Sequence, residues 1–316
     1  MPGIGVISNP RSRQNQRDPA SMRRLAYLVG NRGDAAATRS LDDLYRVAEE
    51  FKQERIEILA INGGDGTLHH TLTAFIKAYG AEPLPEVAIL RGGTMNTIAN
   101  SLGIKGTPAR LLFELVDRYH NGDPFEVFEK QILAIGDAHG FIFGNGLLYN
   151  FLDAYYSTGR PSPSVAARLL LSAVMSALVG GPLARRLTAR FRARVTVDGD
   201  PWAREDFMTV AAGCVEQIGL GFRPFYRCNQ RENAFALLGI HAASPFGLVA
   251  ELPRILRGLP MRRDKAIDAL ASEVLFESDE PVRYIIDGDT YETTKPLRLG
   301  VGPRVKFIRL TGHVSE

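Results

Sequence analysis

The chain contains few of the residues that would assign it to a specialised class. Its 316 residues include two cysteines, Cys214 and Cys228, which form no CxxC pair and have no histidine pair near them. A structural zinc site needs about four ligands at close spacing, so we expect two reduced intracellular thiols. The N-terminus lacks a basic segment followed by an apolar one, so we expect no signal peptide.

Long apolar segments are missing as well. The longest weakly charged run, Leu169 to Ala184, contains the breakers Gly180-Gly181-Pro182. It is shorter than the ~20 residues that span a bilayer, so we predict a cytoplasmic protein and leave open a peripheral contact with the inner membrane face. Nucleic-acid binding is disfavoured, because we find no recognised motif and the aromatic residues are not interleaved with the basic runs.

The composition is that of a folded protein of more than one domain. Hydrophobic residues make up 45% of the chain and charged residues 23%, which argues against disorder. A length of 316 residues favours about two domains. The formal net charge is +3, but arginines are concentrated locally, so the local field matters more than the total.

Strand and helix signals alternate over the first 120 residues or so. Apolar strand patterns occur at Ile4 to Ser8, Ile56 to Ile61 and Val87 to Leu90. Helical patterns occur at Leu41 to Gln53 with Ser40 as N-cap, at Thr67 to Ala78 and at Asn96 to Leu102. This alternation predicts an α/β domain with a parallel sheet. Right-handed crossovers then place the turns that follow successive strands at the same carboxyl edge.

From about Phe125 the pattern changes to short strands separated by turns, which predicts an antiparallel β-rich second domain. The predicted strands are Phe128 to Ile135, Gly140 to Phe143, Ala193 to Val197, Phe207 to Ala212, Ala234 to Ile240, Glu273 to Glu277, Val282 to Ile286 and Leu297 to Leu299. Helices are predicted at Ser164 to Leu178 and Phe246 to Leu256. The domains are thus 1–124 and 125–299, with the tail 300–316 expected to complete the first through a strand at Arg304 to Leu310.

A Gly-rich turn, Gly63 to Thr67, lies between a buried strand and a helix. Its glycines let the main chain approach a ligand closely, and its N–H groups with the helix N-terminus form an anion site. A carboxylate such as Asp65 is repelled by a bound anion unless it binds Mg²⁺ or accepts a proton from an attacking hydroxyl. The alternative is a structural turn in which Asp65 caps the helix.

A second turn of the same kind, Gly92 to Asn96, follows the next strand and precedes the next helix. Two Gly-rich turns at one sheet edge can face each other across the phosphate chain of a nucleotide. The second turn therefore strengthens the interpretation of the first as a phosphate site.

These motifs resemble the diacylglycerol kinase catalytic-domain family. Ile61 to Leu68 is similar to the family's GGDGT segment, and Leu90 to Ala99 is similar to its PxGTxNDFA-like loop. The family includes sphingosine kinases, ceramide kinases and bacterial lipid kinases, with NAD kinases as more distant relatives.

Further elements extend the resemblance over most of the chain. Ser8-Asn9-Pro10 is similar to the family's NPxSG, and Thr38 stands where the family has a nucleotide-contacting threonine. Phe143 to Gly146 is similar to the loop that opens the second domain, and Ile285 to Asp289 is similar to the DGE motif. Several elements in the family's order are more specific than any one of them.

The resemblance implies an N-terminal α/β nucleotide-binding domain with a Rossmann-like parallel sheet, a β-rich acceptor domain, and an active site in the cleft between them. ATP with Mg²⁺ would donate the phosphoryl group, and the hydroxyl of a neutral lipid would attack it. The expected nucleotide-binding residues are Asn9, Thr38, Gly63, Gly64, Gly66, Thr67, Gly92, Gly93, Thr94 and Asn96. The expected catalytic residues are Asp65, Asp287 and Asp289, with Asp65 and Asp287 as metal ligands. Whether Asp65 or Asp289 is the base is open, and the alternative for Asp287-Gly288 is a type I′ hairpin turn.

The sequence departs from the family at several positions. Arg11-Ser12-Arg13 replaces the Ser-Gly after Asn-Pro, and His69-His70 replaces the usual Asn-Glu. Two adjacent histidines on a helix diverge by about 100°, so we expect at least one to have no special role. Thr97 removes a carboxylate, and Asp289 is shorter than the family's glutamate.

The acceptor remains open between diacylglycerol, ceramide and sphingoid bases. An apolar helix over Val165 to Leu187, followed by arginines from Arg185 to Arg194, can lie on an anionic membrane and admit a lipid; a core helix followed by solvated arginines is the alternative. Two other functions stay in competition, an NAD kinase-like soluble kinase and a nucleotide-binding protein without catalysis. The expected partner is a lipid substrate at a membrane surface, and a homodimer is left open.

Overall fold

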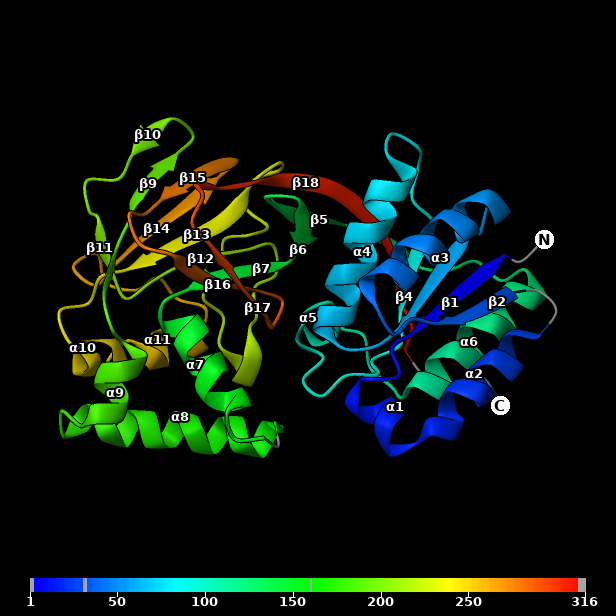
Figure 1. The fold of residues 1–316 in the computed structure, drawn as a ribbon, viewed down its shortest axis with the longest axis horizontal. Helices are drawn as coiled ribbons and strands as arrows, with labels where there is room; N and C mark the ends of the chain where they lie inside the picture. The colour runs from blue at the N-terminus through cyan, green and yellow to red at the C-terminus, as the bar shows by residue number, and fades with distance from the viewer. Residues whose placement is uncertain (1–2, 31–32, 160, 312–316) are drawn as a thin grey trace. The chain divides into compact units, whose positions relative to one another are not determined.

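The structure is a computed structural model that describes residues 3–30, 33–159 and 161–311. The chain forms two compact units, unit 1 with Met1–Lys130 and Arg304–Glu316, and unit 2 with Gln131–Pro303. It passes from unit 1 to unit 2 within strand β5 (Val127–Ile135) and returns within strand β18 (Leu297–Ile308) (Figure 1). The sequence pattern placed these boundaries after residues 124 and 299.

Unit 1 contains a parallel sheet in the order β18-β4-β3-β1-β2. Its strands are β1 (Ile4–Ser8), β2 (Gly33–Ala37), β3 (Ile58–Asn62), β4 (Glu86–Ile89) and the end of β18. The central strands β1 and β3 are buried along their whole length, as expected for parallel strands that are covered on both faces. The register pairs Ile7 with Ile61 and Ile61 with Ile89, so the strand ends are level.

Helices cover both faces of this sheet. They are α1 (Arg13–Arg17), α2 (Pro19–Val29), α3 (Leu41–Glu54), α4 (Asp65–Tyr79), α5 (Thr97–Ser101) and α6 (Pro108–Asn121). Helices α3 and α4 pack together on one face, and α2 and α6 pack together on the other (Figure 1). The Ser40 side chain accepts a hydrogen bond from the Asp43 N–H, which confirms the predicted N-cap of α3.

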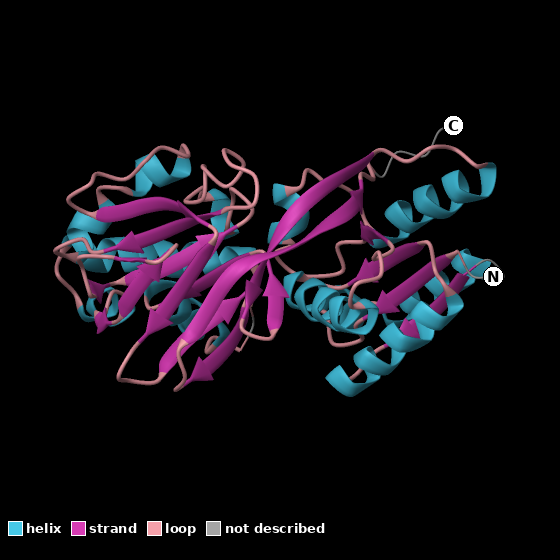
Figure 2. Ribbon diagram, turned by 90° about the horizontal axis from the view of Figure 1, so that it is seen from above, coloured by secondary structure: helices cyan, strands magenta, loops and turns pink. Residues whose placement is uncertain are grey.

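Unit 2 is built mainly from antiparallel strands, which dominate its part of Figure 2. One sheet has the order β14-β13-β12-β7-β16-β17. These strands are β7 (Ile142–Asn145), β12 (Thr209–Gly213), β13 (Phe235–Ile240), β14 (Ala266–Ala271), β16 (Val282–Ile286) and β17 (Asp289–Thr293). The other sheet joins β9 (Arg194–Val197), β10 (Asp200–Pro201), β15 (Glu273–Glu277), β18, β5 and β6 (Ala138–Gly140). A separate pair is formed by β8 (Phe191–Arg192) and β11 (Asp206–Phe207).

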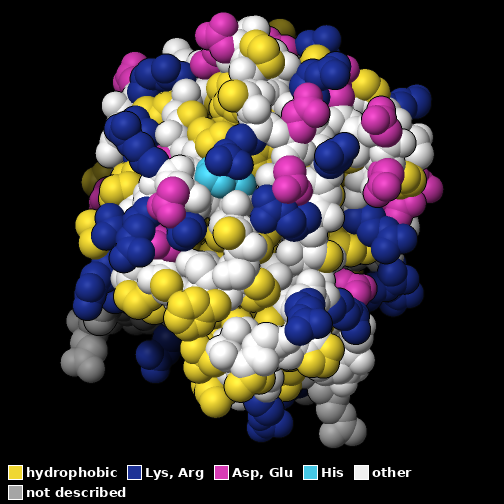
Figure 3. All heavy atoms as spheres, turned by 90° about the vertical axis from the view of Figure 1, so that its left-hand side faces the viewer, with side chains coloured by type: hydrophobic (Ala, Val, Ile, Leu, Met, Phe, Trp, Pro, Cys, Tyr) yellow, Lys and Arg dark blue, Asp and Glu magenta, His cyan; other side chains and the backbone are white. Residues whose placement is uncertain are grey.

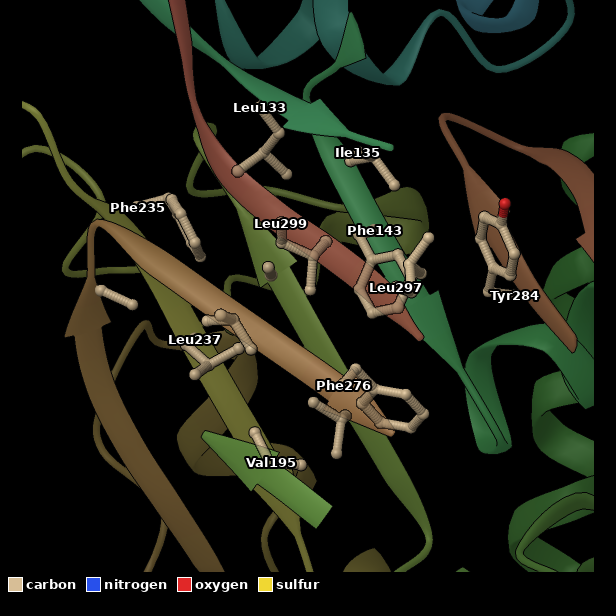
Figure 4. Close-up of a cluster of buried hydrophobic side chains, with 14 of the residues drawn as sticks. Leu133, Ile135, Phe143, Val195, Phe235, Leu237, Phe276, Tyr284, Leu297 and Leu299 are labelled. Carbon is tan, nitrogen blue, oxygen red and sulfur yellow. The ribbon is translucent and has the colours of Figure 1, made fainter. Parts of the chain in front are cut away.

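The core of unit 2 lies between these two sheets (Figure 4). Leu133, Phe276 and Leu299 come from the sheet that contains β18, and Phe143 and Phe235 come from the sheet that contains β7. All five side chains are buried, so apolar burial between the sheets holds the unit together. The predicted fold class, an α/β domain followed by an antiparallel β-rich domain, is confirmed.

The helices of unit 2 differ in part from the prediction. They are α7 (Leu147–Tyr156), α8 (Pro163–Leu178), α9 (Pro182–Leu187), α10 (Pro245–Val249) and α11 (Leu252–Leu256). The single helix predicted over Phe246 to Leu256 is wrong, because the chain forms α10 and α11 instead. Pro253 lacks an N–H and fits the first turn of a new helix, so it favours the restart. Within the described ranges, no helix has both the length and the apolar character needed to cross a bilayer.

Candidate active site

The carboxyl ends of the parallel strands in unit 1 carry the loops that the sequence singled out. Asn9 follows β1, Thr38 follows β2, the turn at Gly63 follows β3 and the turn at Gly92 follows β4. Ligands of open α/β sheets bind at this edge, where helix N-termini and loops converge. The sheet therefore brings the predicted nucleotide-binding residues of unit 1 to one edge.

The two Gly-rich turns lie against each other. A Cβ atom built on Gly93 would lie 2.3 Å from the Cα of Gly64, and one built on Gly64 would lie 3.2 Å from the Cα of Gly93. A Cβ on Gly92 would lie 2.4 Å from Oδ1 of Asn62. Side chains at Gly92 and Gly93 would force the turns apart, so the contact requires glycine. The prediction that both turns lie at the same sheet edge is confirmed.

Asp65 connects the two turns. It is the first residue of α4, and its carboxylate accepts hydrogen bonds from the N–H of Thr97 at 2.9 Å and of Ile98 at 3.0 Å. These are the first two residues of α5, so Asp65 satisfies the N-terminus of the helix that follows the second turn. No side chain caps α4 itself, whose N-cap is Gly64. Asp65 therefore caps a helix, but the helix that it caps is the neighbouring α5 and not α4.

The surroundings of Asp65 act on its acidity in opposite directions. Burial raises the pKa of the Asp65 carboxyl, because the charged form loses solvation. The hydrogen bonds from Ile98 and Thr97 and the charge of Arg91 lower the pKa, but the desolvation effect is larger and the pKa is raised overall. A carboxylate with a raised pKa accepts a proton more readily than an ordinary aspartate.

Asparagines hold the loop after β1 in place. The side-chain amide of Asn9 donates to Oγ1 of Thr67 at 2.9 Å, and its Oδ1 accepts from the N–H of Arg11 at 2.8 Å. Asn62 donates to Oγ of Ser8 at 3.2 Å and to Oδ1 of Asn15 at 3.1 Å. Asn9 therefore positions the start of α4, whereas its nucleotide contact stays a prediction.

Asn15 and Asn62 were not predicted as site residues. Both are buried, and Oδ1 of Asn62 has no hydrogen-bond partner within the part of the chain that the structure describes. For Asn62 the signal was its position directly before the first Gly-rich turn. For Asn15 the sequence contains no comparable signal. Its hydrogen bonds with Asn9 and Asn62 form only when the chain is folded.

Asn96 shapes the second turn from within. Its backbone is in the left-handed region with φ 48°, its Oδ1 accepts from the Gly93 N–H at 3.0 Å, and its Nδ2 donates to the Gly93 carbonyl at 3.2 Å. The Gly93 N–H is therefore already hydrogen-bonded. The role of Gly93 is to let the two turns approach each other closely, and its N–H is not offered to a ligand. The Thr38 N–H donates to the Ser8 carbonyl, which fixes Thr38 at the end of β2. The nucleotide roles of Thr38, Thr94 and Asn96 stay predictions.

The two histidines of α4 lie closer together than expected. His69 is buried and His70 is partly exposed, yet their ring centroids are 4.5 Å apart. The expected divergence applies to the Cβ directions, and side-chain rotation brings the rings together.

In unit 2, Asp287 lies in a two-residue turn between β16 and β17. Asp287 has φ 48° and Gly288 has φ 100°, and Ile286 pairs with Asp289, which is the predicted alternative of a type I′ hairpin turn. The buried Asp287 carboxylate accepts hydrogen bonds from the N–H of Phe141 at 2.9 Å and of Ile142 at 2.8 Å. Asp287 thus fastens the turn to β7, and the predicted catalytic roles of Asp287 and Asp289 and the metal role of Asp287 stay predictions.

The edge of the unit 1 sheet fits the phosphates of a nucleotide. The first N–H groups of α4 have no intrahelical partners and no side-chain cap. They lie beside glycines that allow a phosphate to approach the main chain closely. Each Asp65 oxygen accepts one main-chain N–H, and a carboxylate oxygen has capacity for a second interaction. Asp65 can therefore still act as an oxygen ligand of a hard cation such as Mg²⁺.

Comparison with known proteins agrees with this geometry. Residues 3–123 match the family model described as the diacylglycerol kinase catalytic domain. This segment contains both Gly-rich turns and Asp65, so the resemblance predicted from the motifs is confirmed. No curated protein matches the chain.

Solved structures with the same fold come from Bacillus anthracis str. Sterne. One, described as a diacylglycerol kinase, has a TM-score of 0.67 and 16% sequence identity, and the alignment covers 98% of this chain and 97% of that chain. Two others, described as proposed diacylglycerol kinases, have TM-scores of 0.72 and 0.70 at 17% identity with the same coverage. At this identity the similarity establishes the two-domain fold, and the acceptor must be argued separately.

Proposed function

We propose, from the match of residues 3–123 to the diacylglycerol kinase catalytic domain, that this chain transfers the γ-phosphoryl group of ATP to a hydroxyl of a neutral lipid. The observation that carries the proposal is the contact between the turns at Gly64 and Gly93 beside the uncapped N-terminus of α4. The N-terminus of a long helix that is flanked by glycines is suited to bind phosphate oxygens, because no side chain hinders the main-chain N–H groups from reaching them.

The residues of unit 1 divide the work between binding and orientation. The N–H groups at the start of α4 bind phosphate oxygens, and Asn9 keeps Thr67 in place at that helix end. Asp65 holds α5 against α4 and presents a carboxylate of raised pKa to the phosphates. Mg²⁺, when bound, neutralises charge on the phosphates, and Asp65 is the unit 1 residue proposed to hold it.

A base must take the proton of the attacking hydroxyl, and the two candidates are Asp65 and Asp289. Burial favours Asp65, because the raised pKa of its carboxyl brings its proton affinity closer to that of a catalytic base. Asp289 is the first residue of β17, directly after the turn that Asp287 fastens. The assignment is tested by comparing Asp65→Asn with Asp289→Asn.

The acceptor class is proposed to be diacylglycerol or a ceramide or sphingoid lipid. The support is the family match together with the solved structures described as diacylglycerol kinases. The experiment is incubation of the purified protein with radiolabelled ATP, Mg²⁺ and separate panels of neutral lipids and NAD, with mass spectrometry of the products. Phosphorylated lipid supports the proposal, and phosphorylation of NAD alone replaces it with the soluble-kinase alternative.

Two observations favour a nucleotide-binding protein without catalysis as the second candidate. Both Asp65 oxygens accept main-chain N–H groups, and Thr97 stands where the family has an aspartate. In that case the protein binds ATP, but neither the lipid panel nor NAD gives a product, and Asp65→Asn leaves background hydrolysis unchanged.

A further inference from the structure

The second Gly-rich turn is closed by two side chains that lie on either side of it. Arg91 directly precedes the turn, and its Nη1 donates hydrogen bonds to Oδ1 of Asn100, at 2.8 Å, and to the carbonyl oxygen of Ile104. Asn100 belongs to α5, and its Nδ2 donates to the carbonyl oxygen of Met95 at 3.1 Å. These contacts form a bridge, which we define as the side chains of Arg91 and Asn100, from the residue before the turn to a residue within it.

The main chain at Arg91 is in a conformation that residues with side chains rarely adopt. Its φ is 59°, in the left-handed region that favours glycine. A non-glycine residue in this region costs free energy, and it persists only where surrounding contacts hold it. The hydrogen bonds from the guanidinium group of Arg91 to Asn100 and Ile104 are such contacts, so the bridge and the path of the main chain into the turn depend on each other.

Arg91 differs from the surface arginines of the chain, which lie among carboxylates. On the end face of unit 2, Lys and Arg side chains are interspersed with Asp and Glu (Figure 3). Arg190 of unit 2, for example, pairs with Asp206 at 2.7 Å. Arg91 is half-buried and forms no ion pair within the described ranges, and its hydrogen bonds go to two uncharged oxygens. The guanidinium group is therefore held by the segment that follows the turn and not by a neighbouring carboxylate.

The turn that the bridge closes has main-chain donors available for a ligand. The N–H groups of Thr94 and Met95 have no hydrogen-bond acceptor in the part of the chain that the structure describes. Successive N–H groups in a turn can form a concave site for an anion. This turn lies against the turn at Gly64, which precedes α4 and which the proposed function assigns to phosphate. A phosphate oxygen between the two turns would therefore find donors on both sides.

We propose that Arg91 and Asn100 are positioning residues for ATP, because their bridge holds the second turn in the conformation that presents the N–H groups of Thr94 and Met95 to a phosphate oxygen. The inference rests on the proposed function and adds to it the residues that set the shape of the second turn. Neither side chain of the bridge touches the nucleotide, and each acts through the main chain that it holds. Asp65 holds the start of α5, and the bridge ties the turn to later residues of the same segment.

Three substitutions at Arg91 separate its side chain from its main-chain conformation. Arg91→Met keeps the length of the side chain but has no donor. Arg91→Gly removes the side chain and adopts a φ of 59° at little cost. Arg91→Lys keeps the bridge, because both hydrogen bonds come from one nitrogen, which an ammonium group can replace. At the other end of the bridge, Asn100→Asp keeps the acceptor for Arg91 and loses the donor to Met95.

The experiment measures binding of ATP with Mg²⁺ to the full chain by isothermal titration without lipid, and hydrogen exchange of residues 92–104 without nucleotide. We expect Arg91→Met, Arg91→Gly and Asn100→Asp to bind ATP about tenfold more weakly and to exchange faster in this segment, because hydrogen bonds that order the turn are lost. Arg91→Lys should bind ATP nearly as tightly as the wild type. The matched control is Arg110→Met, which changes an exposed arginine of α6 and should behave as the wild type.

Steady-state kinetics distinguish a positioning role from a general loss of stability. In Arg91→Met the KM for ATP should rise while the KM for the lipid acceptor stays unchanged, whereas partial unfolding would affect both substrates. A wild type that binds no ATP removes the kinase proposal together with this inference. A wild type that binds ATP, with an Arg91→Met variant that binds it equally well, removes the inference alone. Unchanged hydrogen exchange in Arg91→Met and Arg91→Gly also overturns it, because the bridge would then not order the turn.

Discussion

The carboxylate of Asp65 accepts a hydrogen bond from the main-chain N–H of Ile98 at 3.0 Å, which fastens the start of α4 to the start of α5. Each of these helices follows one of the Gly-rich turns. The residue proposed to manage a metal or a proton therefore also fixes the geometry of the phosphate site. The effect of a substitution at Asp65 on turnover and its effect on stability can be measured separately.

Asp65→Asn is expected to lower kcat by ~10² or more, because the amide can neither take a proton nor bind Mg²⁺ well. Only one of the two acceptors remains, so a loss of roughly 1 kcal/mol of folding free energy is also expected. Steady-state kinetics and thermal denaturation measure the two effects. Asp117→Asn, at an exposed position of α6, is the control, and an Asp65→Asn enzyme with the kcat of that control would remove Asp65 from the chemistry.

The pH dependence of turnover should contain an acidic limb that belongs to Asp65. Its carboxyl has a pKa raised above 3.8 by burial, so activity rises with pH as the group loses its proton above that value. In stability the sign is opposite: the folded state binds this proton more tightly than the unfolded state, so the free energy of unfolding falls as pH rises through the raised pKa. A pH–rate profile whose acidic limb persists unchanged in Asp65→Asn, measured on its residual activity, contradicts the assignment.

Gly93→Ala should weaken ATP binding by tenfold or more, because the added Cβ would lie 2.3 Å from the Cα of Gly64 and must displace one of the turns. Gly300→Ala is the matched control, since nothing lies within 4 Å of its added Cβ. Isothermal titration with ATP compares the two variants. Equal affinities would show that contact between the turns is not required for the nucleotide.

Asp287→Ala should destabilise the protein by about 2 kcal/mol, because the buried N–H groups of Phe141 and Ile142 lose their acceptor. Asp289→Asn removes a charge next to the same turn and should leave thermal stability nearly unchanged. Thermal denaturation of both variants, together with their kcat values, separates the structural contact from a catalytic role. An Asp287→Ala protein as stable as the wild type would show that these hydrogen bonds contribute little.

Much of unit 1 could be predicted because its signals are local. Each signal is contained in a short stretch of sequence: the apolar runs of β1 and β3, the helical spacing of α3, and the glycines after β3 and β4. Strand β2 was missed, because Gly33–Ala37 has no apolar alternation and is mostly exposed. It is a strand because the neighbouring β1 offers a parallel edge with which it pairs.

Strand β18 shows the same limit of local sequence signals. The sequence predicted two separate strands at Leu297 to Leu299 and Arg304 to Leu310, because glycines and Pro303 lie between them. The chain instead forms one strand, Leu297–Ile308, since its first residues pair with β15, its end pairs with β4, and β5 pairs with it as well. The tertiary pairing overrides the local breakers.

The sequence by itself determined the alternation of strands and helices, the two Gly-rich turns and the arginine-rich, acid-free stretch around α8. These features follow from periodicity, turn chemistry and charge, which depend on residues that are close together in the sequence. Only the tertiary structure decided that Asp65 caps α5, that Asp287 binds the N–H groups of Phe141 and Ile142, and that α8 turns its large apolar side chains to solvent. Those contacts join residues 33 and 145 positions apart, and packing alone brings such distant groups within hydrogen-bond distance.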